Sequence, residues 1–168
     1  LRQLRVSRAM GSVAETFDND ELSHLPGPLA IGHVRYSTAG ESQLSNAQPI
    51  LIDCAHGQIA ICHNGNIVNA SELRDELVRQ GSIFQSGSDT EGVLHLYARS
   101  KAASVDEAIV EAVAQVQGAC SFLMLTKDQL VAVRDPHGFR PLALGRLGDA
   151  TVVCSETCAM DLIGATYV

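Results

Sequence analysis

The stretch Gln58-Ile59-Ala60-Ile61-Cys62-His63-Asn64-Gly65-Asn66 runs from a short apolar segment into four polar or flexible residues. Residues 58–62 predict a buried strand. Asn64 then carries a side-chain amide, and Gly65 has a backbone N–H that no side chain shields. Two such donors aimed at one point form an oxyanion hole. An Asn-Gly pair is also the commonest signal for a tight turn, so these residues alone leave a hairpin turn open.

The elements predicted around this stretch form a group of strands, a group of helices and a second group of strands. Long helices are expected to begin at Asn69, Ser88 and Ser104, each with a Glu three residues later as capping-box partner. A short last helix is expected from Ser155 through Leu162, and the first 27 residues are expected to be irregular. This order predicts two antiparallel sheets with helices packed on them, an α+β domain. The strands are expected at 29–35, 49–53, 57–62, 119–125, 130–133, 141–144 and 151–154.

Composition limits the classes of function that are open to the chain. With 168 residues, 46% apolar and 18% charged, it is expected to form one globular domain. The net charge is −7 and the basic residues are scattered, so nucleic acid is not an expected partner. No apolar stretch approaches the roughly 20 residues of a membrane helix, so a membrane is not expected either. Five cysteines, an odd number, and the lack of a signal core predict a cytoplasmic location.

Two charged residues could complete a site for an amino acid. Arg35 ends a predicted strand and precedes Ser37 and Thr38, so its guanidinium and these hydroxyls could bind a carboxylate. Asp89 lies in the first turn of a predicted helix and could bind an ammonium group. Both have ordinary alternatives, because Arg35 could pair with any surface acid and Asp89 could simply stabilise the positive end of the helix.

A nucleophile is missing from this set of residues. Cys62 and His63 are consecutive on a predicted strand, so their side chains point to opposite faces and cannot form a dyad. Cys54 and His56 could share a face, but nothing in the sequence orients the histidine. The two thiols near the end of the chain, at positions 154 and 158, have no partner residues that would make a zinc site. No metal site is therefore predicted.

Two further runs are unusual without indicating a mechanism. Residues 133–142 pack Arg, Asp, His and Arg into a proline-bounded loop, and residues 155–161 read Ser-Glu-Thr-Cys-Ala-Met-Asp. The first run could form a salt-bridged connector, a wall of the binding pocket or part of a domain interface. We favour the connector, because no spacing typical of an acid, base or nucleophile is evident.

Taken in order, these motifs resemble the glutamine amidotransferase domain of the amidophosphoribosyltransferases. The resemblance runs from about Met10 to the last residue. Class II amidotransferases such as glucosamine-6-phosphate synthase and asparagine synthetase look similar around Arg35, Asn64-Gly65 and Asp89, whereas residues 135–141 point to the purine enzymes. The motifs are GHVRYSTAG at 32–40, NAQP at 46–49, HNGNIVNA at 63–70, SDTE at 88–91, RDPHGFRPLALG at 134–145 and the run 155–165.

The resemblance implies a fold and a set of roles. The fold is the N-terminal nucleophile hydrolase fold, a four-layer αββα sandwich of two antiparallel sheets, here expected to be incomplete at the N-terminal strand. The implied roles place Arg35 and Thr38 at the carboxylate of glutamine and Asp89 at its ammonium group. Asn64 and the Gly65 N–H are implied to bind the oxyanion.

The sequence departs from this family at its start. The family nucleophile is an N-terminal Cys whose own amino group acts as base, whereas Leu1 stands first here. Residues 1–168 are therefore expected to be a partial amidotransferase domain that is inactive alone, with a phosphoribosyltransferase domain expected after residue 168. Two alternatives remain: an amidotransferase for another acceptor, such as glucosamine-6-phosphate synthase, and a degenerate module that binds glutamine without chemistry.

The resemblance also implies substrates and cofactors for a longer parent enzyme. Glutamine, phosphoribosyl pyrophosphate and water would give phosphoribosylamine, glutamate and pyrophosphate, the first committed step of purine nucleotide biosynthesis. No cofactor is expected in this segment. Magnesium is implied for the transferase domain, a 4Fe-4S cluster for some relatives, and a homo-oligomer for the parent.

Overall fold

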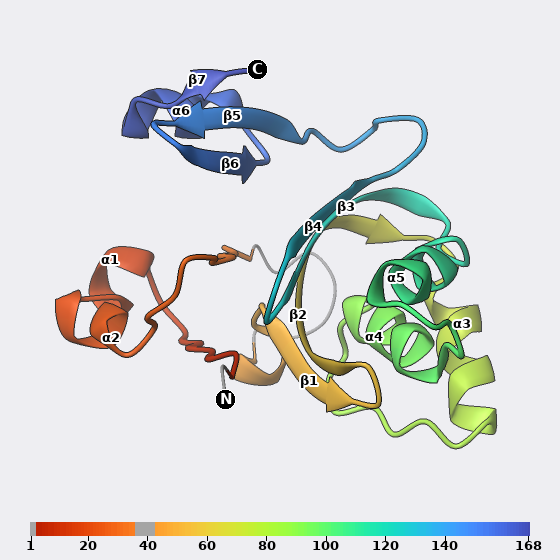
Figure 1. The fold of residues 1–168 in the computed structure, drawn as a ribbon. Coiled ribbons are helices and arrows are strands. Elements are labelled where there is room, and N and C mark those ends of the chain that lie inside the picture. The colour runs from red at the N-terminus through yellow and green to blue at the C-terminus, as the bar shows by residue number, and fades with distance from the viewer. Residues whose placement is uncertain (1–2, 36–42) are drawn as a thin grey trace.

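The computed structural model describes residues 3–35 and 43–168, and it contains two antiparallel sheets with helices (Figure 1). The predicted α+β class is therefore confirmed. A four-stranded sheet has the order β1-β2-β3-β4, and a three-stranded sheet has the order β6-β5-β7. In the described residues, no helix is long and apolar enough to cross a membrane.

The four-stranded sheet consists of two hairpins that pair with each other at the centre of the sheet. β1 (Ile50–Cys54) pairs with β2 (Gly57–Ile67), and β3 (Gly118–Thr126) pairs with β4 (Leu130–Arg134). The two long strands β2 and β3 pair with each other over their whole shared length, from Ile59 opposite Thr126 to Ile67 opposite Gly118. The sheet is therefore organised around the strand that carries the Asn-Gly motif.

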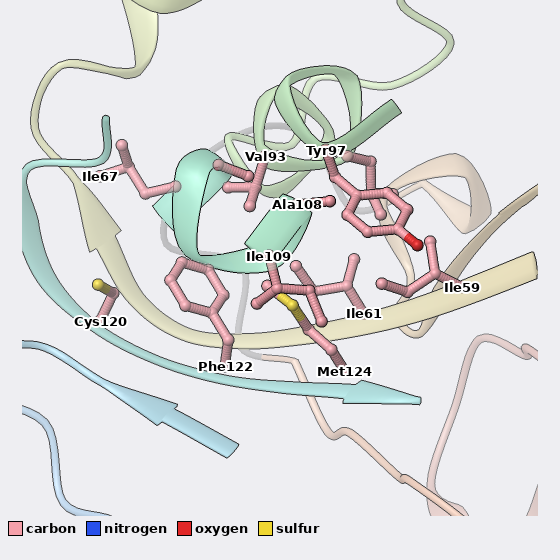
Figure 2. Packing of buried hydrophobic residues seen from close by; sticks show 12 residues of the cluster. Ile59, Ile61, Ile67, Val93, Tyr97, Ala108, Ile109, Cys120, Phe122 and Met124 are labelled. Atoms are coloured by element: carbon pink, nitrogen blue, oxygen red, sulfur yellow. The ribbon is translucent and has the colours of Figure 1, made fainter. Parts of the chain in front are cut away.

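Three helices cover one face of this sheet: α3 (Ala70–Arg79), α4 (Thr90–Arg99) and α5 (Val105–Val113). Alternate residues of β2 and β3 point toward them, because side chains alternate between the two faces of a strand. Figure 2 shows the resulting core, in which strand and helix side chains interdigitate. All of its members are at least nine-tenths buried, and they include Ile59, Ile61, Val93, Tyr97, Ile109, Phe122 and Met124.

The C-terminal part forms a separate small sheet beyond the connection that follows β4 (Figure 1). It consists of β5 (Ala143–Leu147), β6 (Ala150–Cys154) and β7 (Thr166–Tyr167), with α6 (Thr157–Ile163) packed on it. Met160 of α6 is 1% exposed. Its sulfur lies so close to Gly145 that a Cβ at position 145 would be 2.7 Å away. The close approach of helix and sheet therefore depends on this glycine.

The N-terminal part differs from the expectation in two respects. The supposedly irregular region contains two short helices, α1 (Val13–Thr16) and α2 (Asn19–Ser23), and the 3-10 helix η1 (Leu44–Asn46) follows later. The predicted strand at 29–35 is wrong: this segment has no ladder partner in the described residues. A strand needs a neighbour to hydrogen-bond with, and apolar character alone does not provide one.

Of the predicted caps, only one formed as expected. Ser104 and Glu107 make a complete capping box at the start of α5. Asn69 precedes α3, but its side chain bonds instead to the backbone of Gln115 and Gln117 in the loop before β3. Ser88 is not the cap of α4, and Ser155 is not the cap of α6, where Glu156 takes that position. Long-range hydrogen bonds thus replaced the expected local ones at Asn69 and Ser155, whereas the Ser88 hydroxyl accepts the nearby Thr90 N–H.

Candidate functional site

His63, Asn64, Gly65 and Asn66 lie inside β2, so the hairpin-turn interpretation is wrong. They pair in register with residues 122, 121, 120 and 119 of β3. Gly65 has φ +151°, and a Cβ there would lie 2.1 Å from the carbonyl oxygen of Ala119 and 2.8 Å from the Cα of Cys120. Only glycine allows the strand to pass this close to β3 with that backbone angle. The Gly65 backbone is therefore held at one position.

Asp89 precedes α4 and binds β2 on both sides of Asn64 and Gly65. One carboxylate oxygen accepts the backbone N–H of Ile67 at 3.2 Å. The other lies 3.4 Å from Nδ1 of His63 and accepts the Thr90 hydroxyl at 3.2 Å. The structure thus brings Asp89 and the Asn-Gly pair together, although they are 24 or more residues apart in the chain.

The surroundings of Asp89 favour its ionised form. Burial on its own would raise the pKa of this carboxyl group. The contacts with His63, the Ile67 N–H and the Thr90 hydroxyl outweigh burial and lower the pKa. The side chain remains 26% exposed. An ionised carboxylate with a solvent-accessible side can bind a cationic group of a ligand.

His63 contacts groups from three other parts of the chain. Its backbone N–H donates to the side-chain oxygen of Gln48 at 2.6 Å, and its Nδ1 lies 3.2 Å from the Thr90 hydroxyl. Its ring stacks on Phe122, with centroids 4.6 Å apart. Its Nε2 is buried and has no hydrogen-bond partner in the described part of the chain. The sequence analysis rejected His63 as a partner of Cys62 and assigned it no other role.

Asn64 reaches the second sheet through its side chain. Its Nδ2 donates to the hydroxyl of Ser155, which directly follows β6, at 3.2 Å. The sequence had placed Ser155 at a helix cap, so this contact was missed. A contact across 91 positions leaves no local sequence signal, and only the resemblance had grouped the two motifs. Ser155 therefore limits the orientations open to the Asn64 amide.

Arg35 and His33 lie near the place where Asp89 contacts β2. His33 is half-buried, and burial is the main cause that lowers its pKa, followed by the nearby His63 and by the charge of Arg35. Arg35 and His63 are thus both within electrostatic range of His33. Thr38, the other expected carboxylate ligand, lies with Ser37 outside the described residues.

Polar side chains around the contact between Asp89 and β2 hold the adjoining loops in place. Asn46 accepts the Gly87 N–H at 2.9 Å, and the amide of Gln48 donates to Thr90 at 3.4 Å. Both carboxylate oxygens of Glu91 accept hydrogen bonds from the loop before α4, from Gln85 N–H at 2.7 Å and Ser86 N–H at 2.8 Å. The three motifs at 46–49, 63–70 and 88–91 are therefore one connected network.

None of the described thiols is arranged as a nucleophile at the contact between Asp89 and β2. Burial raises the pKa of Cys62 to about 12. Burial, helped by the charges of Asp135 and Asp89, also raises the pKa of Cys120. Cys54 and His56 bond separately, to the carbonyls of Gly57 and Ser100, so they form no dyad. Among the described residues, no group of three or more His, Cys, Asp and Glu is placed to hold a metal ion.

The loop between β4 and β5 is organised by its own side chains. Asp135 is buried and accepts three backbone N–H groups, those of His137, Phe139 and Arg140. The guanidinium of Arg134 donates to the carbonyls of Gly138 and Arg140. Arg134 and Asp135 thus bond to the backbone of the loop itself, and neither forms one of the salt bridges of the expected salt-bridged connector among the described residues.

Comparison with known proteins gives one consistent family. Residues 33–161 match the family model described as a glutamine amidotransferase domain. Amidophosphoribosyltransferase 2 of Arabidopsis thaliana is 53% identical over 98% of this chain and 29% of its own length. The amidophosphoribosyltransferase of Bacillus subtilis is 46% identical over 99% of this chain and 35% of its own length. The chain therefore spans about a third of the length of these relatives.

Solved structures agree with the sequence matches. The glutamine phosphoribosylpyrophosphate amidotransferase of B. subtilis, complexed with ADP and GMP, superimposes with a TM-score of 0.88 at 46% identity. The superimposed region covers 94% of this chain and 34% of the B. subtilis chain. A structure described as the allosteric regulatory enzyme of purine biosynthesis gives 0.89 at 47% identity, with the same coverage. The predicted N-terminal nucleophile hydrolase fold is thereby confirmed.

Proposed function

The chain belongs to the glutamine amidotransferase domain family, and on that premise we propose that it forms the glutamine site of an amidophosphoribosyltransferase. One observation carries the proposal: Asp89 binds β2 at His63 and at Ile67, on either side of Asn64 and Gly65. This places a carboxylate that can take an ammonium group beside two donors that can take an oxyanion. An amino acid with a side-chain amide has both features, and glutamine is such a ligand.

Each part of the site has a physical role in this proposal. Asp89 binds the α-ammonium group, because it is ionised and has an exposed side. Arg35, with Thr38, binds the α-carboxylate through the bidentate geometry that a guanidinium offers. The Asn64 amide and the Gly65 N–H donate to the amide oxygen when it becomes negatively charged. Removing one such donor typically costs about 100-fold to 1000-fold in rate.

For the longer protein, the proposed reaction transfers glutamine-derived ammonia to phosphoribosyl pyrophosphate. Its products would be phosphoribosylamine, glutamate and pyrophosphate, in purine biosynthesis. This choice of acceptor is supported by the names of the relatives, which are amidophosphoribosyltransferases at 44–54% identity. An enzyme for a sugar-phosphate acceptor is not favoured by these matches.

The 168-residue polypeptide on its own is expected to bind glutamine without hydrolysing it. Amide hydrolysis by this route needs a thiolate at the carbonyl carbon, and thiolates form poorly where burial raises the pKa, as at Cys62 and Cys120. Ammonia release from glutamine, measured with a coupled assay, should stay at the rate of the buffer. Turnover above that rate that is lost in Asn64→Ala would contradict this expectation.

Cofactors, assembly and location are proposed for the longer protein. We assign no residue of this chain to magnesium or to the 4Fe-4S cluster of some relatives, since the proposed glutamine site uses only hydrogen bonds and charge. A homo-oligomer and a cytoplasmic location are proposed in the same way. A reducing compartment is in keeping with five unpaired cysteines. The Arabidopsis relatives are named as chloroplastic, which is said of those proteins alone.

A series of ligands tests the glutamine site without changing the protein. Calorimetric titrations would compare L-glutamine with glutaramate, which lacks the α-ammonium group, and with 4-aminobutanamide, which lacks the α-carboxylate. Each truncation leaves one charged partner unsatisfied, so affinity should fall by roughly tenfold or more for each. Equal affinities across the series, or no saturable binding of L-glutamine, would contradict the proposed function.

A further inference from the structure

His63 lies between the carboxylate of Asp89 and the strand that carries the oxyanion donors. We propose that His63 is a positioning residue, whose Nδ1–H holds the Asp89 carboxylate toward the amino end of the ligand at a fixed separation from Asn64 and Gly65. This inference rests on the proposed glutamine site and adds a function for a residue that touches neither the ammonium group nor the oxyanion.

The contacts of the ring give it a single orientation. Nδ1 lies 3.4 Å from the Asp89 carboxylate and 3.2 Å from the Thr90 hydroxyl, both at the start of α4. The flat side of the ring stacks on Phe122 of β3. The main chain of His63 is fixed in turn by its ladder with β3 and by Gln48. A displacement of the ring would therefore change the place of Asp89.

The same ring packs against the oxyanion strand. A Cβ at Gly65 would lie 2.8 Å from Nε2 of His63, so the imidazole fills the space above that glycine. Asp89 is thus joined to position 65 through one rigid aromatic ring. Any side chain at 65 would push this ring away from the carboxylate. The distance between the two halves of the ligand site is set by this packing.

The proton on the ring is fixed by what each nitrogen faces. An ionised carboxylate only accepts hydrogen bonds, so Nδ1 must carry the hydrogen that points to Asp89. Nε2 is buried with no partner in the described part of the chain, so a hydrogen there would have no acceptor. Other ionisable groups within electrostatic range include His33, which interacts with His63 and Arg35, and Cys120, which interacts with Asp89 and Asp135. Neither residue hydrogen-bonds to Nε2 in the described part of the chain.

Nitrogen-15 NMR of the unaltered polypeptide tests the first half of this inference. Correlations from the carbon-bound ring protons to the two ring nitrogens show which nitrogen carries a hydrogen. We expect the His63 ring at neutral pH to carry its hydrogen on Nδ1 and to show Nε2 as an unprotonated nitrogen. A ring protonated on Nε2 alone would overturn the proposal, and this measurement requires neither a variant nor bound glutamine.

Two substitutions test the second half. His63→Leu removes the donor, whereas His63→Asn keeps an amide N–H close to the position of Nδ1. Following the Asp89 carboxyl carbon by NMR, we expect its titration midpoint to move to higher pH in His63→Leu and to return toward the original value in His63→Asn. Met124→Ala serves as the control, because it changes another buried side chain of the same sheet, on β3, that forms no hydrogen bond or ion pair with Asp89 among the described residues. An Asp89 midpoint that is unchanged in His63→Leu would overturn the proposal.

Ligand binding separates this inference from the proposed function. In His63→Leu, affinity for L-glutamine should fall by at least about tenfold, whereas affinity for glutaramate, which has no ammonium group, should stay within about twofold. An equal loss for both ligands would overturn the positioning role. If L-glutamine does not bind the unaltered protein, the proposed function fails, while the Asp89 titration still decides the role of His63.

Discussion

Asp89 and Asp135 are two carboxylates with the same kind of hydrogen-bond donor, but the donors come from different parts of the chain. Both accept backbone N–H groups, and both have a lowered pKa although burial alone would raise it. Backbone N–H groups lower the pKa of Asp135, whereas the contact with His63 is the main cause for Asp89 and the Ile67 N–H adds to it. Asp135 accepts three N–H groups that lie two to five residues ahead of it in the chain. Asp89 instead accepts an N–H from position 67 and faces a histidine from position 63.

The difference separates a structural carboxylate from the carboxylate that we propose to bind a ligand. Asp135 is 6% exposed, and its bonds close a local loop. Asp89 has a side chain that is 26% exposed and joins two elements that are far apart in sequence. A carboxylate whose acceptor sites are filled by its own loop has few acceptor sites free for a ligand. A carboxylate that is held by distant residues and keeps an exposed side can bind a ligand.

The largest expected effect comes from filling the space at Gly65. Gly65→Ala would place a methyl group against the Ala119 carbonyl and the His63 ring, at a backbone angle that L-residues avoid. We expect a loss of about 3–5 kcal/mol in the free energy of unfolding, measured by urea titration, together with loss of glutamine binding. Gly92→Ala in α4 is the matched control, because nothing lies within 4 Å of its added Cβ. A Gly65→Ala protein as stable as this control would contradict the close approach of β2 and β3.

Exchanging each carboxylate for an amide tests the comparison itself. Asp89→Asn should weaken glutamine binding by about 100-fold, since an amide cannot supply the charge that an ammonium group requires. Asp135→Asn should lower the unfolding temperature but leave glutamine affinity unchanged. Calorimetric titration and thermal unfolding of both variants provide the measurement. If the two substitutions weakened binding equally, the distinction between a local and a long-range carboxylate would be wrong.

A smaller effect is expected from the contact between the sheets. Ser155→Ala removes the acceptor of the Asn64 amide, which should cost about 1 kcal/mol in the free energy of unfolding. Ser23→Ala is a suitable control, since its hydroxyl bonds only to the carbonyl of Asp20 in an exposed helix. Equal stability of the two variants in urea would show that the bond from Asn64 to Ser155 contributes nothing.

The smallest effect is the pH dependence that Asp89 confers. Because its pKa is lower in the folded than in the unfolded chain, its stabilising contribution is present above the unfolded carboxyl pKa of about 4. It is lost as the pH falls further, through the lower folded pKa. The difference in unfolding free energy between the unaltered protein and Asp89→Asn should therefore shrink from pH 7 to pH 3. A difference that grows over this range would contradict the direction of the shift.

The sequence was sufficient for the elements whose stability is local or periodic. The apolar run at 57–62, the neighbouring strands at 119–125 and 130–133 and the capping box at Ser104 each depend on residues close together in the chain, and all are present. The strand expected at 29–35 failed, because a ladder also needs a partner strand. The sequence cannot supply that information by itself.

For the proposed site, the sequence offered candidate residues but not the contacts that connect them. Asn64, Gly65 and Asp89 were identified from their chemistry and from the resemblance. The continuation of β2 to Ile67 was missed, because Asn and Gly are poor strand formers and only the register with β3 holds them extended. His63 and Ser155 were missed as well, since each acts through a contact with a residue from another element.

The central claim is that β2 and the start of α4 together form the glutamine site. Backbone amide NMR spectra recorded while L-glutamine is added test it most directly. We predict saturable shifts at residues 64–67 and at Asp89, while the loop around Asp135 stays unchanged. Shifts confined to other parts of the chain, or none at concentrations that saturate calorimetric binding, would contradict the account.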